Sequence, residues 1–268
     1  LIKIKLFILI YALFYFYVLF AQKNYTNNWI LTNQNGIHFS NDSAEQLNHN
    51  YLFFPFSEGS VSISDPNTGN LLFFSNGSTI FNKMGIPMPN GDSIKGHWSA
   101  SNGTLALPLP GSTTIFYVFT TPQIPDSSNG NGLRFTIIDM SLDSGRGDVV
   151  LGMKNKLMIT PVVEKLCGIR HENKIDYWVI SHKWKSDSFY VFLLTSNGIT
   201  DTVISKIGSM HNFPNQENGI GTMKSTVFGN KIGLCMYGSK KIELFDFDKN
   251  DGKLTNSISL TFNSLVNV

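Results

Sequence analysis

The pattern that decides the fold is clearest in residues 165–207, which read KLCGIRHENKIDYWVISHKWKSDSFYVFLLTSNGITDTVISKI. Runs of aromatic and β-branched residues alternate here with short segments rich in Asn, Asp, Ser and Gly. This alternation is typical of antiparallel strands joined by tight turns, and no apolar stripe has the spacing of a helix. The runs predict strands at 165–167, 177–180, 189–193 and 203–207.

Similar groups of runs recur on both sides of this stretch. Strands are predicted at 61–64, 71–74 and 79–81, at 104–107, 115–119, 134–138 and 149–151, and at 225–227, 232–236, 242–245 and 258–262. Small groups of turn-linked strands that repeat along a chain indicate the blades of a β-propeller. We therefore expect an all-β fold, a β-propeller with about four blades between Gly59 and Phe262. A β-sandwich also has short strands at regular intervals and is the alternative.

The composition fits this fold class and excludes one class of partner. Aromatic residues make up 13% of the 268 residues and charged residues only 15%, as expected for short aromatic strands joined by turns. The formal net charge is +2, and Lys and Arg form no run. Nucleic-acid binding requires clustered basic residues that neutralise phosphates, so no nucleic-acid partner is expected.

The first residues have the composition of an export signal. Two lysines precede an apolar run from Leu6 to Phe20, which is followed by Ala21 and the polar Gln22. This order is typical of a cleavable secretory signal. We predict a signal peptide at residues 1–21, a mature domain at 22–268, and a secreted or cell-surface location. An uncleaved membrane anchor is the alternative, but the run is shorter than the ~20 residues that span a bilayer, so no transmembrane span is expected after cleavage.

Four longer motifs resemble a known family. They are SISDPNTGNLLFFSNGSTIFNKMGIPMPNG (62–91), GLRFTIIDMSLDSGRGDV (132–149), TPVVEKLCGIRHENKIDYWVISHKWKSDSFYVFLLTSNGI (160–199) and ELFDFDKNDGKLTN (243–256). In this order they resemble the N-terminal propeller-like region of large secreted bacterial proteins that end in a gliding-motility-associated, type IX secretion sorting domain. The resemblance covers nearly the whole predicted mature chain.

The resemblance implies a β-propeller, passage to the cell surface or the medium, and a role in adhesion or gliding, and it assigns no catalytic residue. In that family the propeller continues beyond the equivalent of Val268, so we expect the propeller to be truncated at the C-terminus of this sequence. Three residues depart from the family's usual choices: Asn76 replaces an acidic turn residue, Phe81 replaces Trp, and Cys167 replaces a small polar residue. Each suits a packing or turn role.

Four residues are candidates for a ligand site. His171, His182, Trp184 and His211 fall near the ends of predicted strands in the third group. Strand ends of successive blades converge on one face of a propeller, so these side chains are predicted to share a polar patch that binds an extracellular protein or glycan. The alternative is that each histidine caps a strand or packs against a tryptophan. No carboxylate can be placed behind the histidines to orient them, so neither a metal nor a cofactor is predicted.

Two short motifs are better explained as turns. Residues 246–252 resemble the start of a calcium loop, but such a loop needs Gly at its sixth position and Glu at its twelfth, and this segment fits neither. Arg146-Gly147-Asp148 spells an adhesion tripeptide inside a segment with the composition of a hairpin turn. The sequence contains no nucleophile elbow and no phosphate-binding loop, so no catalytic residue is assigned.

The two cysteines, Cys167 and Cys235, lie in apolar runs far apart in the sequence. Free cysteines are among the most buried residues, and a disulfide needs Cα atoms within about 7 Å of each other. We expect both cysteines to be buried and unbridged.

Together these features predict a non-catalytic binding or scaffold module of a larger exported protein, secreted or held at the cell surface. Two alternatives remain open. A propeller enzyme acting on a glycan or lactone would assemble its site from separate blades and carry no linear signature. A purely structural spacer is the third class.

Overall fold

The computed structural model describes residues 24–31, 35–40, 42–48, 58–124, 132–212 and 216–262. The predicted signal peptide, residues 1–21, lies outside the described residues. Within the described part of the chain, no helix is both long enough and apolar enough to cross a membrane.

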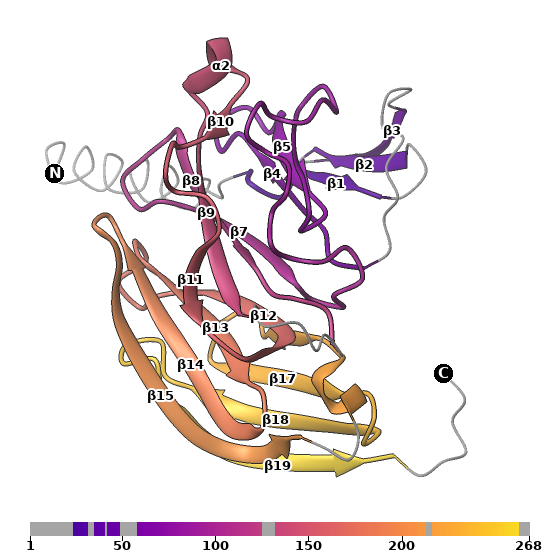
Figure 1. The fold of residues 1–268 in the computed structure, drawn as a ribbon, viewed down its shortest axis with the longest axis vertical. Coiled ribbons are helices and arrows are strands. Elements are labelled where there is room, and N and C mark those ends of the chain that lie inside the picture. The colour runs from indigo at the N-terminus through magenta and orange to yellow at the C-terminus, as the bar shows by residue number, and fades with distance from the viewer. Residues whose placement is uncertain are drawn as a thin grey trace, which may run out of the picture.

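The described residues form five antiparallel sheets that follow one another along the chain (Figure 1). The first two sheets are small. The first contains β1 (Asn28–Ile30), β2 (Asn35–Phe39) and β3 (Ala44–Asn48), and the second contains β4 (Val61–Ser64), β5 (Leu71–Ser75) and β6 (Ile80–Asn82).

The three later sheets are larger. The third contains β7 (Thr104–Pro108), β8 (Ile115–Thr120), β9 (Leu133–Asp139), β10 (Asp148–Val149) and β11 (Lys156–Ile159); the fourth contains β12 (Val162–Arg170), β13 (Tyr177–Lys183), β14 (Ser186–Thr195) and β15 (Gly198–His211); the fifth contains β16 (Met223–Ser225), β17 (Lys231–Met236), β18 (Lys241–Phe247) and β19 (Leu254–Thr261). Short helical turns precede β10 and β16: α2 (Leu142–Gly145) and η1 (Gln216–Gly219).

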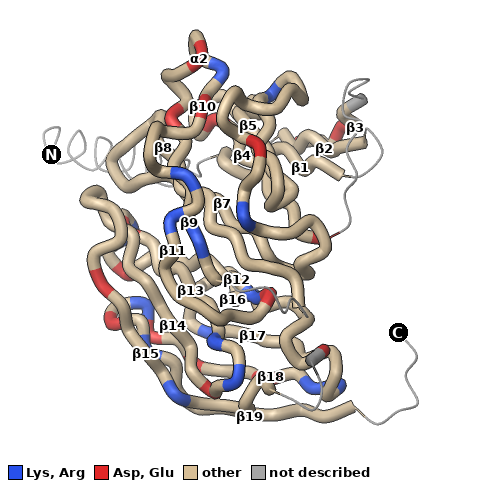
Figure 2. The backbone as a smooth tube through the Cα atoms, in the orientation of Figure 1, with Lys and Arg blue, Asp and Glu red and all other residues tan. Residues whose placement is uncertain are grey.

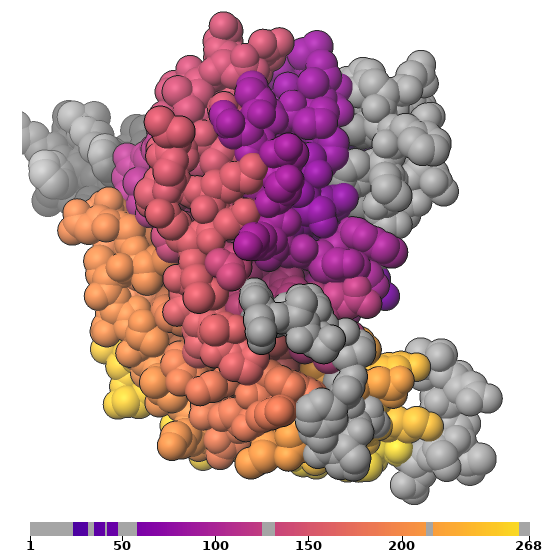
Figure 3. All heavy atoms as spheres, viewed as in Figure 1, coloured from indigo at the N-terminus to yellow at the C-terminus, as the bar shows by residue number. Residues whose placement is uncertain are grey.

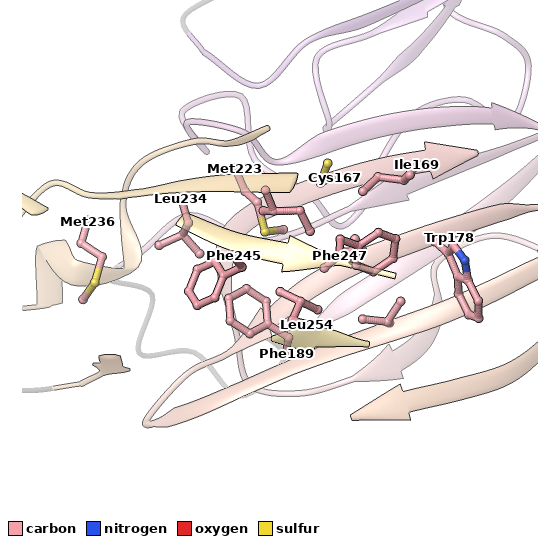
Figure 4. Close-up of a cluster of buried hydrophobic side chains, with 13 residues drawn as sticks. Cys167, Ile169, Trp178, Phe189, Met223, Leu234, Met236, Phe245, Phe247 and Leu254 are labelled. Carbon is pink, nitrogen blue, oxygen red and sulfur yellow. The ribbon is translucent and has the colours of Figure 1, made fainter. Parts of the chain in front are cut away.

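Consecutive sheets pack face to face, and aromatic residues fill the joints between them. Phe73 of the second sheet lies 5.4 Å from Phe116 of the third, measured between ring centroids. Phe189 of the fourth sheet lies 5.0 Å from Phe245 of the fifth (Figure 4). Because successive side chains of a strand point to opposite faces of its sheet, one strand can provide apolar side chains to both neighbouring sheets. In β13, for example, Trp178 packs toward the fifth sheet, and Val179, the next residue, packs toward the third.

The first strands of the second to fifth sheets lie beside one another. β7 contacts β4 on one side and β12 on the other, and β12 also contacts β16. Asn102, just before β7, forms a parallel bridge with Lys165 of β12. The sheets therefore meet along an inner line formed by their first strands.

The all-β prediction is confirmed, and the strand pattern needs two corrections. Strands β1, β2 and β3, which no predicted group included, form a separate sheet that packs on the second: the Asn28 backbone N–H and side-chain amide both donate to Ser64 Oγ. Of the strand predicted at 149–151 only Val149 lies in a strand, β10, and an unpredicted strand, β11, also pairs with β9.

The calcium-like segment contains a hairpin turn, as predicted, and the adhesion-like tripeptide leaves a turn at Arg146 and ends at Asp148, the first residue of β10. The Asp148 carboxylate of the adhesion-like tripeptide is buried and accepts hydrogen bonds from Asn90 N at 2.9 Å and Asn90 Nδ2 at 2.7 Å. The Asp148 side chain therefore makes its hydrogen bonds inside the fold. Asp248 Oδ1 accepts from the backbone N–H of Asn250 at 2.8 Å, which stabilises the β18–β19 hairpin turn.

Both cysteines are free, as expected. Cys167 is buried between the fourth and fifth sheets, and burial raises the pKa of its thiol. Cys235 is only partly buried, which corrects the expectation for this residue. It lies on the opposite face of its sheet from Leu234, which belongs to the core.

Charged residues of both signs are interspersed over the described chain rather than gathered by sign (Figure 2). This distribution agrees with the absence of a basic run in the sequence.

Candidate functional site

The four predicted ligand residues do not form one patch. β12 and β13 are antiparallel, with Arg170 opposite Tyr177 at one end of the hairpin and Val162 opposite Lys183 at the other. His171 follows β12 and so lies at the first end, whereas His182 lies at the second end. The register of the hairpin therefore separates these two histidines.

His182 and His211 are brought together by β14. This strand places Phe189 opposite His182 on one side and Ser186 opposite His211 on the other. The two imidazole rings stack with centroids 3.8 Å apart and planes 22° apart. His182 is 1% exposed and His211 0% exposed, so the pair is sealed from solvent.

The hydrogen bonding of this histidine pair is incomplete. His182 Nδ1 donates to the backbone carbonyl of Lys183 at 2.9 Å. Neither ring nitrogen of His211 has a hydrogen-bond partner among the described residues. A buried polar atom without a partner costs free energy, so the pair is held by packing, including the edge-on contact of Phe189 with His182 at 4.6 Å.

Both imidazoles are neutral at ordinary pH. Burial, reinforced by the positive charge of Lys165, lowers the pKa of His182 to about 3. Burial also holds the pKa of His211 well below its usual value, with further contributions from His182, Lys165 and Lys241.

The other two predicted residues have separate surroundings. Trp184 follows His182 in the β13–β14 turn, is partly buried, and its backbone N–H donates to the Pro161 carbonyl at 3.1 Å. The His171 ring lies 5.4 Å from that of Trp178, and its Nδ1 accepts from the backbone N–H of Asn173 at 3.0 Å. His171 thus caps a turn beside a tryptophan, as the alternative interpretation held.

A buried charged pair on β12 forms the centre of this end of the molecule. The Glu164 carboxylate accepts hydrogen bonds from Ile124 N at 2.5 Å, Ser101 N at 2.8 Å and Ser101 Oγ at 3.0 Å. These donors lie just before β7 and just after β8, so one side chain ties the fourth sheet to the third. Burial raises the pKa of Glu164, and these hydrogen bonds oppose that shift.

Lys165 points to the other side and ties β12 to the fifth sheet. Its Nζ donates to the backbone carbonyls of Asn218 at 3.0 Å, Gly219 at 2.8 Å and Ile220 at 3.1 Å. Three acceptors match the three N–H bonds of an ammonium group. Burial lowers the pKa of Lys165 to about 7, with Glu164 opposing the shift. The three carbonyls also favour the charged form.

Residues before β7 reach across the fourth sheet to residues before β16. The Gly221 N–H donates to Ser101 Oγ at 2.9 Å, and the Met223 N–H donates to Asn102 Oδ1 at 3.1 Å. The third and fifth sheets therefore touch at this end although the fourth lies between them in sequence. We call this set of contacts the hub; it comprises Ser101, Asn102, Glu164, Lys165 and residues 218–223.

The hub is suited to holding sheets together rather than to chemistry. Lys165 donates all three of its N–H bonds to backbone carbonyls, and Glu164 accepts three hydrogen bonds from groups beside the third sheet, so both side chains are engaged in contacts between sheets. The described residues contain no group of three or more His, Cys, Asp or Glu that could hold a metal ion.

Sequence reasoning missed this charged pair. The available signal was the pair Glu164-Lys165 inside the apolar run VVEKLC, where charges are rare unless they are paired inside the fold. Its partners are mostly backbone groups far away in the sequence, which no side-chain pattern reveals.

No protein-family model matches this sequence, and no curated protein matches it. Among solved structures, the chain is similar to one titled "Structure of Dos1 propeller", at 10% sequence identity and a TM-score of 0.34. The alignment covers 77% of this chain and 44% of the other, so this chain spans less than half of that protein's length. A likeness at this level carries no argument about fold or function.

Proposed function

We propose that this chain is an open arc of a β-propeller, exported to the cell surface or the medium, where it serves as a non-catalytic binding or scaffold module of a larger protein. The contact between the third and fifth sheets supports the propeller arrangement. In a parallel stack, sheets separated by a third sheet do not touch, whereas blades arranged around an axis converge at their first strands.

The observation that carries the scaffold role is that the buried charged residues Glu164 and Lys165 form hydrogen bonds between sheets. The three hydrogen bonds that Glu164 accepts and the three that Lys165 donates all join β12 to segments beside the neighbouring sheets. A partly satisfied polar network would weaken the fold, but a fully satisfied one fixes the relative positions of the elements it joins. Rigid sheets with variable loops are a suitable platform for binding an extracellular protein or glycan.

Export is supported by the basic and apolar segment within residues 1–21 and by the resemblance to secreted proteins with type IX sorting domains. The test is N-terminal sequencing of the protein recovered from the cell surface or medium. A mature chain that begins close to Gln22 supports export through a cleaved signal, and a chain that retains Leu1 contradicts it.

The binding role is tested by screening the exported protein against glycans and extracellular polymers, with product analysis on every bound glycan and on a panel of lactones. Binding without turnover supports the proposal. Turnover by the purified protein would contradict it and favour the enzyme alternative. The ligand role of His171, His182, Trp184 and His211 stays a prediction; a ligand meets the first and third more readily, because the other two rings are buried.

A further inference from the structure

Two apolar residues occupy the turn between β16 and β17. Val227 and Phe228 are 93% and 76% exposed. Turn positions are more often taken by Gly, Pro, Asn, Asp or Ser, which suit the backbone of a turn. Here the Thr226 N–H donates to the Lys231 carbonyl at 3.0 Å, and the Gly229 N–H donates to the Thr226 carbonyl at 2.9 Å. These backbone hydrogen bonds hold the turn, so the two apolar side chains extend into solvent from a fixed base.

A third exposed apolar residue lies in a neighbouring turn. Ile175, in the turn between β12 and β13, is 61% exposed. Lys249 of the β18–β19 turn contacts both of the other turns: its Nζ pairs with Glu172 Oε2 at 2.8 Å, and a methyl group at Gly229 would lie 3.2 Å from its Cδ. The three turns therefore lie together at one end of the fourth and fifth sheets. We call the three exposed apolar residues at this end the apolar tips: Ile175, Val227 and Phe228.

The acidic residues around the apolar tips are already engaged, whereas two lysines are not. Asp176 accepts a hydrogen bond from the Asn173 side chain, and Asp248 accepts one from a backbone N–H of its own turn. Lys174, next to Ile175, and Lys224, on β16, are exposed and form no ion pair among the described residues. The other acidic residues at this end are held in the ion pairs Lys231–Asp246, Lys249–Glu172 and Lys253–Asp251.

A lipid bilayer fits the apolar tips better than a protein surface does. A stable protein interface buries about 800 Å² of each partner in one continuous contact. The apolar tips lie on two turns with the Lys249–Glu172 ion pair between them, so they offer no continuous apolar area. A bilayer needs no complementary shape, because apolar side chains enter the boundary between headgroups and acyl chains while neighbouring lysines contact anionic headgroups.

We propose that the apolar tips insert into the surface of a lipid bilayer, with Lys174 and Lys224 on anionic headgroups. This end of the fourth and fifth sheets then lies against the membrane, and the chain binds the bilayer as a peripheral protein. The inference goes beyond the proposed function, because it depends neither on export nor on a glycan or protein ligand.

The test uses a signal local to the apolar tips, because the apolar residues 1–21 can themselves bind vesicles. Phe228→Cys, in a chain that also carries Cys235→Ser, is labelled with an environment-sensitive fluorophore that takes the place of the ring, and is mixed with vesicles of phosphatidylcholine containing phosphatidylserine. Leu151→Cys in the same background is the matched control. Leu151 is 98% exposed and follows β10, and Figures 1 and 3 show the segment around β10 and the fifth sheet in different parts of the molecule. Thermal melts confirm that all variants remain folded.

We expect the fluorophore at position 228 to shift its emission to the blue when vesicles are added, and the fluorophore at position 151 to keep its emission. Adding Val227→Ser to the Phe228→Cys chain should raise the vesicle concentration for half of the shift by about tenfold, since one apolar side chain no longer enters the bilayer. Vesicles without phosphatidylserine should weaken the shift by about fivefold for each lysine that contacts a headgroup.

Three outcomes overturn the proposal. The first is emission at position 228 that does not change with vesicles, which indicates that the apolar tips contact a protein instead. The second is an equal shift at positions 228 and 151, which indicates adsorption of the whole surface rather than insertion of the tips. The third is a titration that Val227→Ser leaves unchanged. Equal shifts with and without phosphatidylserine would overturn the role given to the two lysines.

Discussion

Lowering the pH should weaken the joint between the fourth and fifth sheets, because that joint encloses two neutral imidazoles. In the folded chain the pKa of His182 is about 3, whereas an unfolded histidine titrates near its ordinary value of 6.5. Below pH 6.5 the unfolded chain therefore binds more protons than the folded chain. Stability is fully present above that pH and is lost progressively as the pH falls toward 3.

The size of the effect follows from these two values. At pH 5 an unfolded histidine is almost fully protonated while buried His182 is not, which costs about 2 kcal/mol of unfolding free energy. The pKa of His211 is shifted in the same direction, so it adds a loss of the same sign. Together the two residues should therefore lower the unfolding free energy at pH 5 by more than His182 does alone.

The assay is urea unfolding at pH 7.5 and pH 5.0 for the unmodified chain and for His211→Phe. Phenylalanine keeps an aromatic ring stacked on His182 and removes one proton-binding site, and it breaks no hydrogen bond that the described residues make with the imidazole. The loss between the two pH values should be smaller in His211→Phe than in the unmodified chain, because one buried neutral imidazole has been removed. His171→Gln, at the other end of the β12–β13 hairpin, is the control for loss of a histidine outside the buried pair.

The difference between the unmodified chain and His211→Phe isolates the contribution of His211 to the pH dependence of stability. The pKa of Glu164 is raised by burial, so it titrates in the opposite sense, and this contribution is common to all three proteins. Equal losses in the unmodified chain and in His211→Phe would refute the reasoning, since they would show that the buried ring does not remain neutral while the chain is folded.

Three further predictions concern the hub and the buried side chains. Lys165→Met removes the donor to three carbonyls at 218–220 and should lower the unfolding free energy by about 3 kcal/mol in urea; unchanged stability would show that the tie is dispensable. Glu243→Gln weakens charge-assisted hydrogen bonds from two serines on β15 and β19 and should cost about 1–2 kcal/mol in the same assay, while an unaltered midpoint would contradict this. Cys235 should react with iodoacetamide in the native protein and Cys167 only after unfolding, as followed by mass spectrometry; equal native rates would contradict their difference in burial.

Strand positions were predictable where apolar residues were dense. The runs at 177–180 and 189–193 fall inside β13 and β14 because both faces of their sheet are buried and so both require apolar side chains. Strand β3 of the first sheet escaped prediction for the opposite reason. It reads AEQLN, has mostly exposed residues and lacks β-branched or aromatic side chains.

The candidate site was predictable only in part. The proximity of His182 and His211 follows from their places at the ends of strands that flank β14. The separation of His171 depends on the register of the β12–β13 hairpin, which sequence alone leaves open. The partners of Lys165 are backbone carbonyls more than fifty residues away, and every residue type carries such a carbonyl, so the sequence holds no signature of this contact.

The hub imposes an order on folding. A chain that emerges from its N-terminus can form the third and fourth sheets in turn, since their strands are close in sequence. Lys165 then remains without acceptors, and Ser101 and Asn102 without their later donors, until residues 218–223 arrive. In a chain interrupted before residue 218, Lys165 would lack its three carbonyl acceptors, so the side of β12 that faces the fifth sheet would be left incomplete.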